Sequence, residues 1–374
     1  MFSIYNLGFF DVPYLPIMNH KSLIIDGHLD LAMNAIDWNR DLRKSVEEIR
    51  RLEHGKTDLR GRANSTISFD EMRRGKMGLC LSTLIARYAK PDHPLGGWQS
   101  PEQAWAQTCA QLAWYREMER EGQMRQITSA EGLEQHLQQW MSGSTDAIGY
   151  ILTLEGADSI ISWDHLQQRV DEGLIAIGPA HYGPGTYAFG TDSEGSIGAK
   201  GKALLREMEK RNLVLDATHL CDTSFWEAME CFSGHVWASH SNCRKIVDHN
   251  RQFADEQLKT LLERDAVIGL PLDAWMMIPG WIKFQSHPSN TDIRLEHMVN
   301  HIDHICELAG DTNHVGLGTD LDGGFGLEQT PSDVHTIADM QKLPDILASR
   351  GYSDDDIEKI MWGNWLRKIK EVLN

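Results

Sequence analysis

The sequence predicts an α/β fold, specifically a (β/α)8 TIM barrel with extra helices at its C-terminus. Two observations support this prediction. Eight short apolar runs are spread along the 374 residues, and most of them are separated by amphipathic stretches that carry helix signals. Alternation of strands and helices is typical of a parallel sheet, and a count of eight indicates a barrel. An open, doubly wound sheet is the alternative that the same alternation allows.

The eight predicted strands are apolar runs of strand length, bounded by polar or turn-forming residues. In chain order they occupy residues 22–30 (SLIIDGHLD), 77–86 (MGLCLSTLIA), 147–158 (AIGYILTLEGAD), 173–181 (GLIAIGPAH), 213–219 (LVLDATH), 235–241 (HVWASHS), 266–274 (AVIGLPLDA) and 314–323 (HVGLGTDLDG). Several of these runs are apolar at nearly every position, as expected for strands buried on both faces.

Helix signals occupy most of the intervals between the runs. Ser100, Pro101 and Gln103 form a capping-box pattern with proline at the first helical position, which predicts a helix ending near Gly122. Asp222 is expected to cap a helix over residues 222–232. Apolar residues at helical spacing predict further helices at residues 200–212, 254–265 and 292–310. Residues 353–374 are expected to add one or two helices that pack on the outside of the barrel.

No repeat, low-complexity tract or linker divides the chain, so residues 1–374 are expected to form a single domain, with residues 1–20 as an N-terminal arm. No apolar run reaches the length of about 18 residues that a membrane-spanning helix needs. The first residues lack a basic segment and are interrupted by Asp11, Pro13 and Pro16, so no signal peptide is expected.

The formal net charge is −18, which disfavours partners such as nucleic acid and anionic membranes. The six cysteines include no Cys-x-x-Cys pair, and a chain of this size does not need a disulfide framework. A cytoplasmic location is therefore expected.

Polar residues end several of the predicted strands, and in a barrel these ends meet at one mouth, where active sites are built. The residues are His28 and Asp30, Glu155, His181, His219, His240, and Asp320 with Asp322. Each alone has a plain structural explanation, and Asp322-Gly323-Gly324 is expected to be a turn. Together they form the ligand set of divalent transition metals, above all zinc, and would suit a two-metal site with a bridging carboxylate. His301 and His304 fall on a helix pattern and are expected to be solvated.

Six segments resemble, in the same order, those of the renal (membrane) dipeptidase family of amidohydrolase-type metal-dependent barrels. They are DGHLDL, LEGADSI, AHYGPG, LDATHL, ASHSN and GLGTDLDG, and the resemblance covers roughly residues 22–370. It implies two zinc ions per chain: His28 and Asp30 match the ligands of one ion, Glu155 matches the bridging glutamate, and His219 and His240 match the ligands of the other.

The resemblance also assigns residues to the substrate. His181 matches the histidine that contacts the scissile carbonyl and stabilises the oxyanion, and Arg251 matches the arginine that binds the terminal carboxylate. Asp320 matches the aspartate that contacts the substrate and shuttles the proton. The implied activity is that of a zinc-dependent dipeptidase that cleaves small dipeptides with a free C-terminal carboxylate by a metal-bridged hydroxide. Because relatives are often homodimers, the resemblance also raises the expectation of a homodimer.

Some positions depart from the family pattern. Leu29 and Gln252 stand where the family has asparagine, and residues 182–195 and 271–281 replace its usual substrate-side segments. These changes leave the predicted metal ligands intact and put the substrate range in doubt. Two alternatives therefore stay open: another amidohydrolase activity, for example on an N-acyl amino acid, and a non-catalytic metal-binding barrel.

Overall fold

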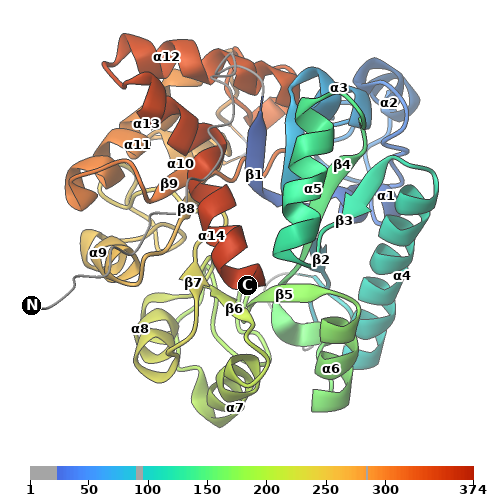
Figure 1. The fold of residues 1–374 in the computed structure, drawn as a ribbon, viewed down its shortest axis with the longest axis vertical. Coiled ribbons are helices and arrows are strands. Elements are labelled where there is room, and N and C mark those ends of the chain that lie inside the picture. Colours follow the sequence, from blue (N-terminus) through green and yellow to red (C-terminus); the bar gives the residue numbers. More distant parts are fainter. Residues whose placement is uncertain (1–22, 90–95, 284) are drawn as a thin grey trace, which may run out of the picture.

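The computed structural model describes residues 23–89, 96–283 and 285–374, and the predicted N-terminal arm at residues 1–20 lies outside them. Eight parallel strands form a nearly closed barrel, in the spatial order β7-β6-β5-β4-β2-β1-β9-β8 (Figure 1). A bridge between Ala238 and Ile268 links its two edge strands, β7 and β8. The predicted barrel is thus confirmed, and the alternative of an open sheet is wrong.

Each barrel strand lies within one of the eight predicted runs. The strands are β1 (Ile24–Leu29), β2 (Met77–Ile85), β4 (Ile148–Glu155), β5 (Leu174–Gly178), β6 (Val214–Asp216), β7 (Val236–Trp237), β8 (Ile268–Leu270) and β9 (Val315–Leu317). An additional strand, β3 (Met124–Gln126), pairs with the start of β4. It was not expected, because three residues are too few to give a recognisable apolar run.

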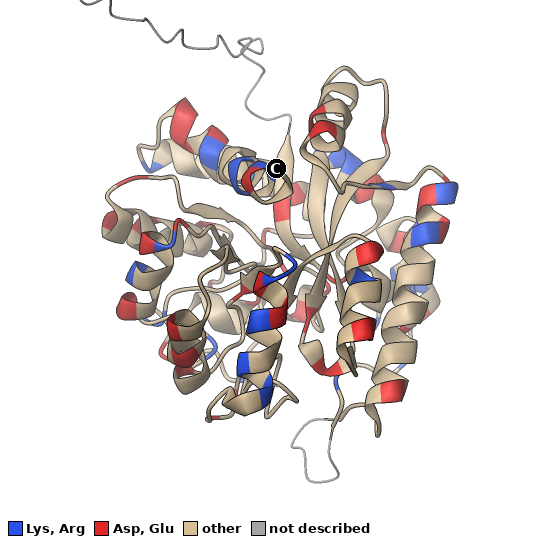
Figure 2. Ribbon diagram, turned by 60° about the horizontal axis from the view of Figure 1, so that its bottom comes forward, with Lys and Arg blue, Asp and Glu red and all other residues tan. Residues whose placement is uncertain are grey.

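Helices surround the barrel, and Figure 2 shows acidic and basic residues spread over them. They are α1 (Leu31–Ile36), α2 (Val46–Glu53), α3 (Phe69–Arg74), α4 (Pro101–Arg120), α5 (Ala130–Met141), α6 (Trp163–Asp171), α7 (Gly198–Glu209), α8 (Asp222–Cys231), α9 (Asp255–Glu263), α10 (Ala274–Met277), α11 (Glu296–Ala309), α12 (Leu343–Ser349), α13 (Asp354–Glu358) and α14 (Asn364–Leu373). Of the helices among the described residues, none has the length and apolar character that crossing a membrane requires.

The starts of two helices, α4 and α8, test the N-caps predicted from the sequence. At α4 the predicted capping box is present: Ser100 Oγ accepts from the N–H of Gln103, whose side chain accepts from the N–H of Ser100. At α8 the prediction is wrong by one residue, since Cys221 is the N-cap. Asp222 instead accepts hydrogen bonds of 2.8 and 2.6 Å from the guanidinium of Arg244.

The C-terminal helix α14 covers the end of the barrel where the strands begin, and Figure 1 shows it in front of them. Trp365 is fully buried, donates from Nε1 to the carbonyl of Leu317 at 2.7 Å, and occupies the space that Gly27 and Gly316 leave open. It shares an apolar cluster with Trp237 of β7. This helix therefore closes one end of the barrel instead of joining the ring outside it, and truncating Trp365 would cost about 3–5 kcal/mol.

Candidate metal centre and active site

The opposite end of the barrel, where the strands end, carries a pocket that gathers the predicted site residues. Its lining includes Asp30, Glu155, His181, His219, His240, Arg251 and Asp320, together with Tyr182, Asp273, Met276 and Gly323. His28 lies at the side of this pocket, with Nε2 3.9 Å from Asp320 Oδ1. All eight residues predicted to bind metal or substrate are therefore neighbours.

Glu155 occupies the centre of the cluster, and its two carboxylate oxygens face different partners. Oε1 lies 3.0 Å from Nε2 of His219 and 3.3 Å from Nε2 of His240. Oε2 lies 3.6 Å from Nε2 of His28, which is in turn 3.8 Å from Asp30 Oδ2. The last residue of β4 thus stands between one His/Asp pair and one His/His pair.

The orientation of the histidines fits metal ligation. Nδ1 of His219 lies 2.9 Å from the hydroxyl of Thr191, and Nδ1 of His240 lies 2.8 Å from the hydroxyl of Ser239. These contacts turn both Nε2 atoms inward, where they are 3.2 Å apart. Metal-binding histidines are usually held this way, by a polar partner at the nitrogen that faces away from the ion.

Two buried atoms support the same conclusion. Nε2 of His28 and Oδ1 of Asp30 are buried and have no hydrogen-bond partner. Burying such polar atoms is costly unless a ligand satisfies them. Ligand atoms from His28, Asp30 and Glu155 lie within 4.8 Å of one another, as do those from Glu155, His181 and His219. Imidazole nitrogens and carboxylate oxygens in this arrangement fit divalent transition metals.

The electrostatics of the cluster also favour a cation. Burial raises the pKa of Glu155 and that of Asp320, and the nearby Asp30 acts in the same direction on both. Burial alone lowers the pKa of His28, but Glu155, Asp30 and Asp320 together raise it to about 10. Three buried carboxyl groups therefore repel one another when ionised, and a divalent cation among them would relieve this repulsion.

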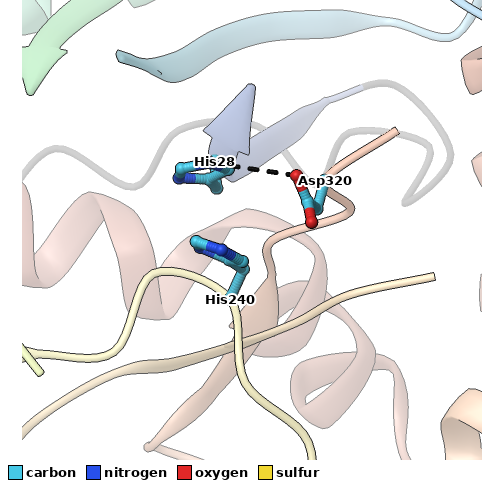
Figure 3. A group of neighbouring side chains, drawn as sticks. All are labelled: His28, His240 and Asp320. Atoms are coloured by element: carbon cyan, nitrogen blue, oxygen red, sulfur yellow. Dashed lines mark ion pairs between the residues drawn. The ribbon is translucent and has the colours of Figure 1, made fainter. Parts of the chain in front are cut away.

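Asp320 lies in the loop after β9 and points toward β1, as Figure 3 shows for Asp320, His28 and His240. The rings of His28 and His240 stack with centroids 3.7 Å apart. Gly323 provides the room for this carboxylate, since a Cβ there would lie 1.7 Å from Asp320 Oδ1. Asp320 and His219 have positive φ angles of 54° and 71°, an unusual conformation that is often found at functional sites.

Arg251 lines the pocket and is only 3% exposed. Nη2 donates to the carbonyl of His240 at 2.9 Å, and Nη1 donates to the hydroxyl of Ser241 at 3.4 Å. Both partners are neutral, and no carboxylate within residues 23–89, 96–283 and 285–374 forms an ion pair with this guanidinium. A buried guanidinium whose hydrogen-bond partners are both neutral is suited to bind an anionic group of a ligand.

Two residues near the pocket were missed. Asp273, which follows β8, is 8% exposed and accepts from Nε1 of Trp275 at 2.6 Å and from Nε2 of Gln329 at 2.7 Å. Arg87, just after β2, contacts His181. Arg87 directly follows one predicted strand and Asp273 is the second-to-last residue of another, so the reasoning that selected the other residues would have found them.

Of two other polar residues, His301 differs from expectation and Asp322 lies in the predicted turn. His301 is fully buried: Nδ1 accepts from the N–H of Cys243, and Nε2 lies 3.1 Å from the carbonyl of Met277. The expectation that it is solvated is therefore wrong. Asp322 does lie in a turn, but it is also fully buried and holds several hydrogen bonds.

Comparison with known proteins agrees with the fold and shows the family to which the chain belongs. The profile of the membrane dipeptidase family (peptidase family M19) matches residues 16–374. A crystal structure of a metallopeptidase from Rhodobacter sphaeroides, liganded with a phosphinate mimic of the dipeptide L-Ala-D-Ala, superposes with a TM-score of 0.75. The two chains are 19% identical, and the match covers 94% of this chain and 99% of that one.

Among curated sequences, dipeptidase tcpJ of Claviceps purpurea is 28% identical over 200 residues, which cover 52% of this chain and 43% of that protein. An uncharacterized protein from the pqqA 5′ region of Klebsiella pneumoniae is 26% identical over 189 residues, or 50% of this chain and 65% of that protein. The chain thus matches less than two thirds of the length of these relatives.

Proposed function

Because the chain belongs to the membrane dipeptidase family, we propose that it is a zinc-dependent dipeptidase acting on small dipeptides with a free C-terminal carboxylate. The position of Glu155 carries this proposal. One of its oxygens faces His219 and His240, and the other faces His28. A carboxylate in this position is suited to bridge two ions.

In this proposal His28 and Asp30 would hold one zinc ion, His219 and His240 would hold the second, and Glu155 would contribute to both sites. Zinc in such a site supplies Lewis acidity and lowers the pKa of water to about 7. Five protein ligands for two ions leave His181, Arg251 and Asp320 free to act on the substrate.

Each of the three remaining residues acts on a different part of the reaction. Arg251 binds the C-terminal carboxylate through the planar edge of its guanidinium. His181 donates from Nε2 to the scissile carbonyl oxygen as negative charge develops on it, a contact worth about 2.7–4 kcal/mol. Asp320 accepts the proton of the attacking water and returns it to the nitrogen of the leaving amine.

A hydrolase that acts on N-acyl amino acids is the alternative. Such substrates also end in a carboxylate that Arg251 can bind, and the same ligands would serve the reaction. The unusual segments at residues 182–195 and 271–281 border the substrate side of the pocket, since Tyr182, Asp273 and Met276 line it. A non-catalytic barrel explains less, because it has no use for a carboxylate such as Asp320 beside a complete ligand set.

The test is an activity screen of metal-free and zinc-loaded protein against a dipeptide library and a set of N-acyl amino acids. We expect dipeptide cleavage that requires zinc, stops with a chelator and is retained by the surface variant Asp292→Asn. Cleavage confined to N-acyl amino acids would replace this proposal with the alternative, and no turnover of any amide by the zinc-loaded protein would reject it. The cytoplasmic location and the homodimer stay predictions.

A further inference from the structure

We propose that Arg87 is a positioning residue that fixes the tautomer of His181, so that the ring proton sits on Nε2 and faces the substrate. The inference rests on the proposed function, in which His181 donates to the scissile carbonyl oxygen. Arg87 is neither a proposed metal ligand nor a proposed substrate-binding residue, and the inference gives it a role.

The hydrogen-bonding chemistry of the two side chains determines the direction of the contact. Nη2 of Arg87 lies 2.7 Å from Nδ1 of His181. A guanidinium has only donors and stays protonated in proteins, so Nδ1 must be the acceptor and cannot carry a proton. The neutral imidazole then carries its proton on Nε2.

The other ring nitrogen faces the reaction. Nε2 of His181 lies 3.9 Å from Oε1 of Glu155, on the side of the ring where the proposed metal ligands gather. A donor aimed there in advance can stabilise charge that develops on the carbonyl oxygen. In the opposite tautomer Nε2 would present a lone pair to the same oxygen and repel it.

Neighbouring groups hold Arg87 behind the imidazole. Nη1 donates to the carbonyl of Gly96 at 2.8 Å. Asp158 accepts from the N–H of Tyr88 at 3.1 Å and from the N–H of Thr186 at 2.7 Å. This carboxylate therefore ties the segment that carries Arg87 to the segment that follows His181, and so maintains the distance between them.

Arg87 is also distinct from the proposed carboxylate-binding arginine. Arg251 lines the pocket, whereas Arg87 is not among the lining residues and contacts the far nitrogen of His181. A residue placed in this way acts on the rate of the chemical step and has little effect on substrate binding. The two arginines should therefore differ in their kinetic signatures.

The kinetic test compares Arg87→Ala and Arg87→Lys with the exposed variant Arg294→Ala, all as zinc-loaded protein with a good dipeptide substrate. We expect Arg87→Ala to lower kcat by about 10- to 100-fold, as outer partners of catalytic histidines typically do, with KM within about twofold of wild type. Arg87→Lys should recover part of the loss, and Arg294→Ala should match wild type. Loss expressed only in KM would overturn the proposal.

A double-mutant cycle and a spectroscopic measurement separate positioning from general damage. In a His181→Ala background, Arg87→Ala should have no further effect on kcat, whereas additive losses would contradict the inference.

Nitrogen NMR of histidine-labelled protein, assigned with His181→Ala, should show an unprotonated Nδ1 in wild type and a changed signal in Arg87→Ala. A protonated Nδ1 in wild type would overturn the proposal. This readout needs no turnover, so the tautomer can be tested even if dipeptides prove not to be substrates.

Discussion

Asp322 lies two residues after the proposed proton carrier, yet its contacts give it a structural task. Its carboxylate accepts from the N–H of Thr66 at 2.8 Å, from the N–H of Ile67 at 3.2 Å and from the hydroxyl of Ser65 at 2.8 Å. Nη1 of the fully buried Arg40 lies 3.2 Å away. The substitution Asp322→Asn keeps the shape of this side chain but replaces one acceptor oxygen with a donor.

The cost of this substitution can be worked out from those contacts. On the Oδ2 side, Ser65 and Ile67 would face an amide group that cannot accept, and each buried unpaired donor costs about 1–3 kcal/mol. Arg40 keeps its ion pair with Glu53 at 2.9 Å, so the positive charge of Arg40 still has a negative partner. The expected loss in the free energy of unfolding is therefore about 3–5 kcal/mol, a large part of the 5–15 kcal/mol that is typical of folded proteins.

Urea unfolding of wild type, Asp322→Asn and the exposed control Asp292→Asn measures this loss, and the control should change stability by less than about 0.5 kcal/mol. A loss below about 1 kcal/mol for Asp322→Asn at an unchanged m-value would refute the reasoning. In the folded fraction, kcat per zinc-loaded site should stay near that of wild type. A fall in kcat as large as that of Asp320→Asn would place Asp322 in the catalytic machinery.

Three further predictions concern other residues. Asp320→Asn should keep both metals and lower kcat by about 100-fold or more in a steady-state assay; loss of an ion with near-normal kcat after zinc is restored would make Asp320 a ligand. If Arg251 binds the carboxylate, amidating the C-terminus of a good dipeptide should lower kcat/KM by a factor that corresponds to a loss of about 1.5–3 kcal/mol in transition-state stabilisation. Equal cleavage of the two substrates would show that Arg251 has another role. Burial lowers the pKa of His301 from 6.5 to about 4. As the pH falls, the imidazole of His301 is therefore protonated in the unfolded chain before it is protonated in the folded one. This difference should lower the free energy of unfolding by about 3 kcal/mol between pH 7 and pH 4. Urea unfolding at several pH values should show that His301→Asn removes this part of the pH dependence. The same slope of unfolding free energy against pH in the variant and in wild type would contradict the prediction.

The barrel could be predicted because its strands are buried on both faces and so appear as continuous apolar runs. The position of α14 could not. Its sequence indicates an amphipathic helix, but only the arrangement of Gly27 and Gly316 around Trp365 shows that it closes one end of the barrel. The strand β3 could not be predicted either, since its pairing with β4 depends on tertiary contact.

The residues proposed as metal ligands could be selected because they stand at the ends of strands, and these ends converge in a barrel. Arg251 could not be selected that way, because it lies in the loop 14 residues beyond β7 and only the family resemblance indicated it. The burial of His301 was missed because its position on a helix pattern does not show that α11 packs this face against Cys243 and Met277.

The bridging position of Glu155 is the central claim, and metal content is its most direct test. Elemental analysis after zinc loading and removal of free metal should find about two ions per chain for wild type and for Asp292→Asn. Because each oxygen of Glu155 faces a different set of ligands, Glu155→Gln should weaken both sites and leave about one ion or fewer. A single ion in wild type, or two ions bound equally tightly by Glu155→Gln, would contradict a metal centre bridged by this residue.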